Sequence, residues 1–294
     1  MKSLREVLAD AEARHVAVGH FNISDLGALK AIFAAARELQ LPVLIGVSEG
    51  EREFIGVRQA AALIKSYRDT YDYPIFLNAD HTHSIDKAKE AAEAGFDEII
   101  FDNSSSPMEQ NIANTKAAVA AIRVINPEIV IEGEIGYIGS NSEVMDVAPT
   151  GIALSTPEEA VRFVTETGVD VLAPAVGNMH GLLKSMTTDG TGAEYKHLDI
   201  PRIAAIKTAI AGTNAKFMTL HGGSGTDDSD FTAAARAGMT IIHISSELRL
   251  AWRRGVEEGL KDPNEIAPYK IAAPAVVNIQ KIVTDRLKLF NGIA

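Results

Sequence analysis

The stretch YPIFLNADHTH, residues 73–83, joins an apolar run directly to a group of titratable side chains. Residues 73–77 have the composition of a buried strand. Asp80, His81 and His83 follow at its C-terminal end. An apolar run that ends in polar residues recurs along the chain, and this recurrence decides the predicted fold.

Eight short apolar runs alternate with alanine-rich segments of helical character. The runs are 15–22, 42–48, 73–81, 97–102, 129–134, 170–177, 216–221 and 239–245. Strands that alternate with helices predict a parallel sheet with right-handed crossovers. Eight such units in 294 residues predict an α/β fold, a (β/α)8 TIM barrel that forms a single domain over residues 1–294. A doubly wound open sheet is the alternative, but no GxGxxG motif follows the first run to support it.

Helical segments are expected at both ends of the barrel. The N-terminal segment has helical spacing at Leu4, Val7, Leu8 and Ala11, and it contains acids without the apolar core of a signal peptide. Residues 274–290 also have helical spacing, which predicts a C-terminal helical extension. This extension either packs on the barrel or makes a subunit contact.

Composition narrows the classes of partner. The net charge of −11 argues against nucleic acid or an anionic membrane as the main partner, and no run has the length of a membrane span. A phosphorylated substrate is still allowed, because local backbone amides can outweigh the global charge. The chain has no cysteine, which excludes disulfides and thiolate metal sites and fits a cytoplasmic protein.

Polar residues gather at the predicted strand ends, which meet at one mouth of a barrel. His81, His180 and His221 come from three different strands, and three neutral imidazoles suit a catalytic Zn²⁺. Any one of these histidines alone is better explained as a hydrogen-bonded residue of the core or rim. Asp80 is a general acid/base at the reacting carbon or a buried carboxylate that orients a neighbour. Asp102 and Glu134 are expected either to hydrogen-bond the metal ligands and orient them or to be alternative ligands. His83, His15 and His197 are expected to be ordinary residues, and His20 is undecided.

Two glycine- and serine-containing stretches are suited to phosphate binding. HGGSG (221–225) and HISSE (243–247) follow the last two predicted strands, where barrels often bind phosphate. Their serines are Ser224, Ser245 and Ser246, and Lys184 is a possible nearby cation. A plain tight turn is the alternative explanation for HGGSG. No lysine ends a strand, which disfavours Schiff-base chemistry. Two long loops, 136–154 and 178–199, are expected to be lids or binding loops.

These motifs together resemble a known family. FNIS, PVLIGVSEG, ADH, FDNSSSP, IEGEIG, VGNMHG, LHGGSG and HISSELR are similar, in order and spacing, to the class II (zinc-dependent) fructose-bisphosphate and tagatose-bisphosphate aldolases. The resemblance extends over nearly the whole chain. It implies reversible cleavage of a phosphorylated ketose such as fructose 1,6-bisphosphate, in an enzyme that forms a homodimer or homotetramer.

The resemblance also assigns roles to residues. It implies His81, His180 and His221 as Zn²⁺ ligands, with Asp102 and Glu134 near the metal. Asp80 would take the proton from the hydroxyl at the bond being cleaved. Six residues would bind the phosphate next to the ketone, often with a monovalent cation such as Na⁺ or K⁺: Gly181, Lys184, Gly222, Ser224, Ser245 and Ser246. Asn22 and Ser48 would line the substrate cleft.

The sequence departs from the family pattern at three places. Ser142 stands where members usually carry a loop acid, so we assign the second acid/base to Glu143. His243 stands where many members have an asparagine that contacts substrate. Residues 267–276 lack the arginines of many relatives, which leaves Arg249, Arg253 and Lys270 as candidates for holding the distal phosphate.

Three further functions remain open at this point. A related substrate, such as tagatose 1,6-bisphosphate or another ketose 1-phosphate, is the nearest alternative. A metal-dependent hydrolase is disfavoured, because such sites commonly need an HxH pair on the first strand and HTH occurs here on the third. A non-catalytic sugar-phosphate binder is suggested by Ser142 and His243.

Overall fold

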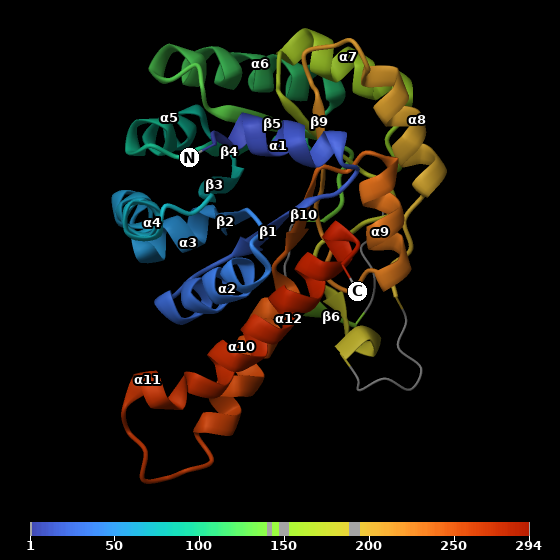
Figure 1. Cartoon of the computed structure of the whole chain (residues 1–294). Coiled ribbons are helices and arrows are strands. Elements are labelled where there is room, and N and C mark those ends of the chain that lie inside the picture. The colour runs from blue at the N-terminus through green and yellow to red at the C-terminus, as the bar shows by residue number, and fades with distance from the viewer. Residues whose placement is uncertain (1, 140–142, 147–152, 188–194, 294) are drawn as a thin grey trace.

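The eight predicted strands form a closed parallel barrel. The structure is a computed structural model, which describes residues 2–139, 143–146, 153–187 and 195–293. The strands close in the order β1-β10-β9-β7-β5-β4-β3-β2, with every neighbouring pair parallel, and Figure 1 shows the helices arranged around them. Their bounds are β1 Val18–Asn22, β2 Val43–Val47, β3 Ile75–Thr82, β4 Glu98–Phe101, β5 Val130–Ile135, β7 Val171–Pro174, β9 Phe217–Leu220 and β10 Ile241–Ile244. The prediction of a (β/α)8 barrel is confirmed.

Amphipathic helices cover the outside of the barrel. They are α2 Leu26–Leu39, α3 Glu49–Ile55, α4 Val57–Tyr71, α5 Ile85–Ala94, α6 Met108–Ile125, α7 Pro157–Thr167, α8 Ile200–Ile210, α9 Asp228–Ala237 and α10 Ser246–Gly259. Most of them begin at a side chain that caps the first turn. In α7, for example, Thr156 and Glu159 form a capping box and Pro157 occupies the first turn. No helix in these described ranges is long and apolar enough to cross a membrane.

The N-terminal helix closes one end of the barrel. Helix α1 (Leu4–Ala13) directs its buried residues Leu4, Val7, Leu8 and Ala11 against the first residues of the barrel strands. Among these strand residues are Val18, Leu44, Phe76 and Val130. This separate apolar cluster seals the N-terminal end and leaves the C-terminal end as the open mouth.

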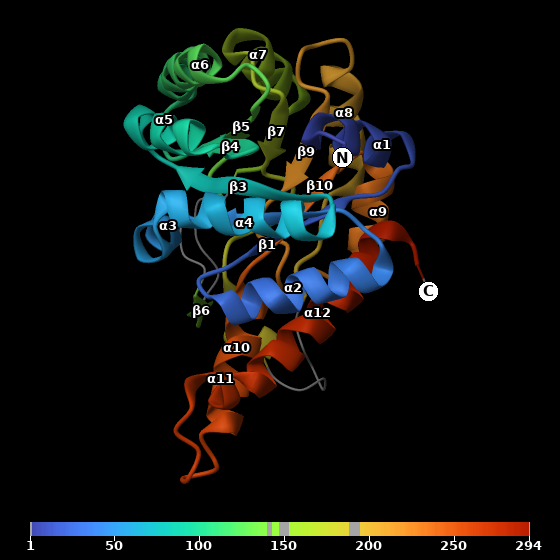
Figure 2. The ribbon, with the colours of Figure 1, turned by 60° about the vertical axis from the view of Figure 1, so that its left-hand side comes forward.

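The C-terminal segment forms an arm as well as a packing helix. Helix α12 (Ala273–Asn291) buries Ile279, Val283, Leu287 and Phe290, so packing on the barrel is confirmed for this helix. Figure 2 shows α10, the short α11 (Pro268–Ile271) and the start of α12 projecting away from the barrel. The arm is tightly packed, because a Cβ on Gly255 of α10 would lie 2.2 Å from Ala275 Cα.

The long loops contain short elements that the sequence did not predict. Strands β6 (Val144–Met145) and β8 (Leu182–Leu183) pair as a two-stranded parallel sheet, and a 3-10 helix, η1, spans Lys184–Thr187. The two loops expected to be lids or binding loops therefore contact each other. Residues 140–142, which include Ser142, together with 147–152 and 188–194, lie outside the described residues.

The buried ring of His20 leaves no space for a side chain at position 46, which is glycine. His20 is fully buried, and its ring stacks on His243 of the neighbouring strand with ring centroids 3.5 Å apart. On the other side, a Cβ at Gly46 would lie 2.1 Å from His20 Cε1. The ring is therefore confined by both neighbouring strands and cannot move away from an added methyl group.

Replacing Gly46 with alanine should destabilise the fold by about 1–3 kcal/mol, the usual cost of overpacking a core. Gly50→Ala is the matched control, because nothing lies within 4 Å of its Cβ position and it sits in α3. Chemical denaturation of both variants would measure the change in unfolding free energy. Equal stability of the Gly46 and Gly50 variants would show that the His20 ring is not confined.

Candidate active site

An irregularity in β3 lets two consecutive residues face the barrel mouth. Adjacent residues of a strand normally point to opposite faces. Here the register with β4 shifts between Ala79 and Thr82, and His81 has a left-handed φ of 37°. Asp80 and His81 consequently both line the same cavity.

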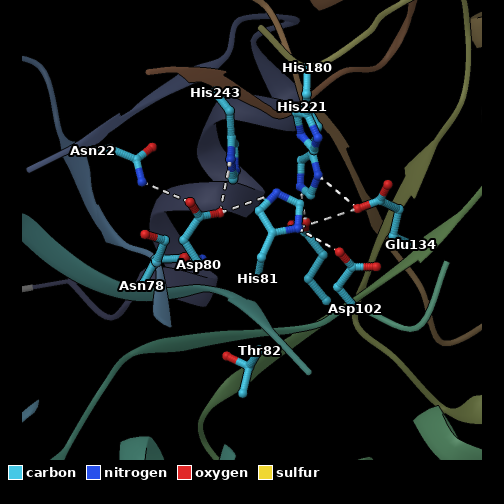
Figure 3. Close-up of polar contacts among 12 residues, drawn as sticks. Asn22, Asn78, Asp80, His81, Thr82, Asp102, Glu134, His180, His221 and His243 are labelled. Atoms are coloured by element: carbon cyan, nitrogen blue, oxygen red, sulfur yellow. Dashed lines mark hydrogen bonds and ion pairs between the residues drawn. The ribbon is translucent and has the colours of Figure 1, made fainter. Parts of the chain in front are cut away.

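Three histidines converge beside this irregularity, as Figure 3 shows. The His81 ring lies 4.8 Å from both the His180 and the His221 ring, measured between centroids. One ligand nitrogen from each residue lies within 4.8 Å of the other two. His180 follows β7 and His221 follows β9, so the barrel assembles the cluster predicted from three strand ends.

The partners of the His81 and His180 rings suit metal ligands. His81 Nδ1 lies 2.8 Å from Asp102 Oδ2, and His180 Nδ1 lies 2.6 Å from the carbonyl oxygen of Gly139. Such contacts leave the Nε2 atoms of His81 and His180 available for a metal and fix the ring orientation. His221 lies between two carboxylates, with Nδ1 3.1 Å from Glu134 Oε2 and Nε2 2.6 Å from Glu132 Oε1. The predicted neighbours of the metal, Asp102 and Glu134, thus both contact predicted ligands.

The electrostatics of this cluster favour bound positive charge. Burial alone would lower the pKa of His221, but Glu132 and Glu134 raise it well above its usual value. Burial likewise opposes protonation of His81, while Asp80 and Asp102 raise its pKa to about 9. Burial and the neighbouring histidines lower the pKa of His180 to about 3. A divalent cation would supply the charge that the protons on His81 and His221 otherwise provide, so these residues fit a metal.

Asp80 is held as a carboxylate with one free oxygen. Burial would raise its pKa, but the charges of His81 and His20 and a hydrogen bond from Asn22 keep it well below its ordinary value. Asn22 Nδ2 donates to Asp80 Oδ2 over 2.8 Å. Within the described residues, the other oxygen, Oδ1, is buried without a hydrogen-bond partner. An ionised carboxylate with a free oxygen beside this histidine cluster is able to accept a proton from a substrate.

The cavity at the mouth has a volume of about 270 Å³. Most residues predicted for the site line it: Asn22, Ser48, Asp80, His81, Asp102, His180, Gly181, Gly222, Ser224, His243, Ser245 and Ser246. Ser245 Oγ has no partner among the described residues, whereas Ser224 Oγ accepts hydrogen bonds from the amides of Ser245 and Glu247. The serine end of the cavity therefore combines a free hydroxyl with the start of α10, a favourable place for an anion.

Comparison with known proteins assigns the family. The model for class-II fructose-bisphosphate aldolase matches residues 2–293. The chain belongs to the class II fructose-bisphosphate aldolase family.

It is 32% identical to the fructose-bisphosphate aldolase of Staphylococcus aureus strain Mu50 over 98% of this chain and 96% of that protein. The fructose-bisphosphate aldolase of Geobacillus stearothermophilus is also 32% identical, over 99% and 96% of the two chains. The crystal structure of the YdjI aldolase from Escherichia coli K12 is similar with a TM-score of 0.81, at 25% identity over 98% and 96% of the chains. The resemblance inferred from the motifs is confirmed.

Several residues predicted for this aldolase lie outside the cavity lining. Glu143 is exposed, and its carbonyl oxygen accepts a hydrogen bond from Leu182. Lys184 is exposed and lies 3.7 Å from Asp146. Of the three residues considered for the distal phosphate, Arg249 lines the cavity, whereas Arg253 and Lys270 pair with Glu257 and Glu265. His83, expected to be an ordinary residue, lies at the exposed rim of the cavity.

A buried arginine, Arg52, supports the aldolase site and was not predicted from the sequence. Arg52 is 2% exposed and donates to the carbonyl oxygens of Val47 and Asp80 and to Thr82 Oγ1, over 2.6, 3.1 and 3.0 Å. It therefore holds the ends of β2 and β3 on both sides of the irregularity. Its position one turn into α3 gave no signal, because an arginine there normally lies in solvent.

Replacing Arg52 with alanine should destabilise the protein by about 2–5 kcal/mol, because three buried acceptors lose a charged donor. Arg58→Ala is the control, since Arg58 is exposed on α4 and should change stability by less than about 0.5 kcal/mol. Thermal and denaturant unfolding would measure both. An Arg52 variant as stable as the Arg58 variant would contradict this supporting role.

Proposed function

We propose that this protein is a zinc-dependent class II aldolase that reversibly cleaves fructose 1,6-bisphosphate to dihydroxyacetone phosphate and glyceraldehyde 3-phosphate. The observation that carries the proposal is the three-histidine cluster beside the free Oδ1 of Asp80, in a cavity with a serine-lined end. The names of the Staphylococcus aureus and Geobacillus stearothermophilus relatives support the choice of substrate.

His81, His180 and His221 are the residues that would hold the metal. Three histidine ligands that leave open positions suit Zn²⁺. When bound, the metal would act as a Lewis acid for negative charge that develops on the ketone half of the substrate. Asp102 and Glu134 would keep the His81 and His221 rings in position.

Asp80 is our candidate for the base in the cleavage direction. Its carboxylate accepts the proton of the C4 hydroxyl, the C3–C4 bond breaks, and the aldehyde forms at C4. The electron pair stays on the ketone-bearing half, which a second acid then protonates at C3. Asn22 holds the other Asp80 oxygen and so aims Oδ1 at the cavity. For the second acid we retain Glu143, and loss of C3 proton exchange in Glu143→Ala would test this choice.

Ser245, Ser246, Ser224, Gly181 and Gly222 are proposed to bind the phosphate next to the ketone. They meet at one end of the cavity, where α10 begins. Arg249 is the proposed contact of the distal phosphate. It lines the cavity and donates to Glu51 Oε1 over 2.8 Å, so it is already positioned by a carboxylate.

His243 gives a reason to test a second ketose as well. Its Nδ1 lies 3.8 Å from Asp80 Oδ1, and His20 stacks on its other face. The His243 imidazole lies beside Asp80, the proposed base, and would therefore contact a substrate near C4. Fructose and tagatose 1,6-bisphosphate differ at this carbon. We therefore propose tagatose 1,6-bisphosphate as the alternative substrate, and the ratio of the two cleavage rates would decide between them.

Chelation should abolish fructose 1,6-bisphosphate cleavage, and added Zn²⁺ should restore it, because the charge on the ketone half needs a Lewis acid. Release of triose phosphate in a coupled assay would measure this. Tagatose 1,6-bisphosphate and a phosphate-ester hydrolysis assay serve as comparisons. Activity that survives complete metal removal would refute the metal-dependent mechanism, and binding without turnover of either sugar would indicate a non-catalytic binder.

Replacing any one of His81, His180 and His221 with alanine should remove the metal together with activity. Asp80→Ala should keep the metal and lower kcat by about 100-fold or more, as expected for loss of a general base. Metal content by elemental analysis and cleavage rates would separate the two effects. Normal turnover in the Asp80 variant would move the base to another residue.

We further propose a cytoplasmic homodimer or homotetramer. The projecting arm of α10–α12 supports self-association, because it exposes Trp252, Ile266, Tyr269 and Val277. Light scattering of the purified protein would establish the number of subunits.

A further inference from the structure

Lys196 is a buried lysine that forms no ion pair within the part of the chain that the structure describes and instead contacts a ring of carbonyl oxygens. It is 5% exposed, and its Nζ lies 2.7 Å from the carbonyl oxygens of Met179 and Gly181. The carbonyl oxygens of Gly222 and Ser224 lie 3.0 and 2.5 Å away. Four oxygens thus surround one ammonium group.

This arrangement has the chemistry of a monovalent-cation site. An ammonium has three N–H donors, so four oxygens exceed what it can satisfy with separate hydrogen bonds. Cages of backbone carbonyl oxygens are how proteins replace the hydration shell of K⁺. The Lys196 ammonium therefore occupies the position that a small cation of single charge would take in such a cage.

The four oxygens belong to the two segments that form the serine end of the cavity. Met179 and Gly181 flank His180, whereas Gly222 and Ser224 follow His221. The segments are pressed together, since a Cβ on Gly222 would lie 2.3 Å from the carbonyl oxygen of Met179. Carbonyl groups that point at one place repel one another unless positive charge lies between them.

The backbone of Lys196 is also anchored to the same region. Its amide donates to the carbonyl oxygen of Gly225, and its carbonyl oxygen accepts from the amide of Asp227. Burial opposes the charged ammonium and lowers its pKa to about 7, with Glu247 partly offsetting the shift. The four contacts with carbonyl oxygens favour the charged ammonium and so oppose this effect of burial.

We propose that the Lys196 ammonium is a built-in replacement for a monovalent cation, which holds the 179–181 and 222–224 segments in the geometry that binds phosphate. Family resemblance alone implies a Na⁺ or K⁺ ion near this phosphate site, and in this chain a side chain takes its place. Lys196 is thus a positioning residue. The inference rests on the proposed function only in taking phosphate as the group bound at this end.

The test is cation rescue in the zinc-loaded protein. Lys196→Ala opens the cage, and Lys196→Met fills the space of the stem without the charge. Wild-type activity and thermal stability should be the same in KCl and choline chloride at equal ionic strength. Both variants should lose about 10- to 100-fold in kcat/KM, the usual effect of removing a residue that orients a binding group. K⁺ or NH₄⁺, but not choline, should restore Lys196→Ala, and neither should restore Lys196→Met.

Two readouts do not depend on aldolase turnover. The melting temperature of Lys196→Ala should rise with KCl more than with choline chloride, and its affinity for inorganic phosphate should rise in parallel. Lys65→Ala is the control, because Lys65 is exposed and pairs with Asp69 on α4. If no sugar is cleaved by any form, these two readouts still decide the role of Lys196.

Several results would overturn the proposal. They are a K⁺-specific response of the wild type, a Lys196→Ala protein that is indifferent to K⁺ in both readouts, and a Lys196→Met protein with normal phosphate affinity. If Lys196→Ala folds only when K⁺ is present, that dependence supports the proposal. If Lys196→Ala fails to fold in every salt tested, the phosphate affinity of Lys196→Met decides the question. A normal affinity would then count against the proposal.

Discussion

The site depends on one departure from regular strand geometry. A regular β3 would place Asp80 and His81 on opposite faces, and Asp80 would be separated from the three-histidine cluster by the thickness of the sheet. The register shift and the left-handed backbone of His81 bring both to the mouth, at a cost of about 1–3 kcal/mol for a non-glycine residue in this conformation. Arg52 and Asp102 hold the ends of the irregular stretch, so the surrounding contacts maintain the unusual backbone.

The sequence predicted the barrel because its periodicity repeats eight times, and each strand was found within a few residues of its expected place. It also predicted the cluster of His81, His180 and His221, because parallel strand ends meet at one rim of a barrel. The polar layer below this cluster could not be predicted. Glu98, for example, is fully buried at the start of β4, where an apolar residue is expected. Asn78 donates to it over 2.7 Å, and burial beside Glu132 raises its pKa well above the usual value.

Residues whose roles depend on loop conformation were the least predictable. Lys184 was expected at the phosphate end because it lies close to His180 in the chain, yet it is exposed. Lys196 lies twelve residues further along the chain and is buried, because its side chain lies between the turns that contain Gly181 and Gly222. Chain proximity is a poor guide in irregular segments, since a side chain of this length spans the distance between neighbouring turns. The contacts of Lys196 and of His20 are properties of the assembled barrel, and neither residue has a local sequence signal.

The apolar seal made by α1 has a consequence for the order of events in catalysis. Because Leu4, Val7 and Leu8 fill the N-terminal end of the barrel, the cavity opens at the mouth and, among the described residues, not at the opposite end. A ligand fragment bound deepest, against the three-histidine cluster, cannot leave while another fragment occupies the entrance. For a reaction that splits one molecule into two, this geometry imposes an order of release, in which the fragment nearer solvent departs first. In the reverse direction the inner fragment must bind first.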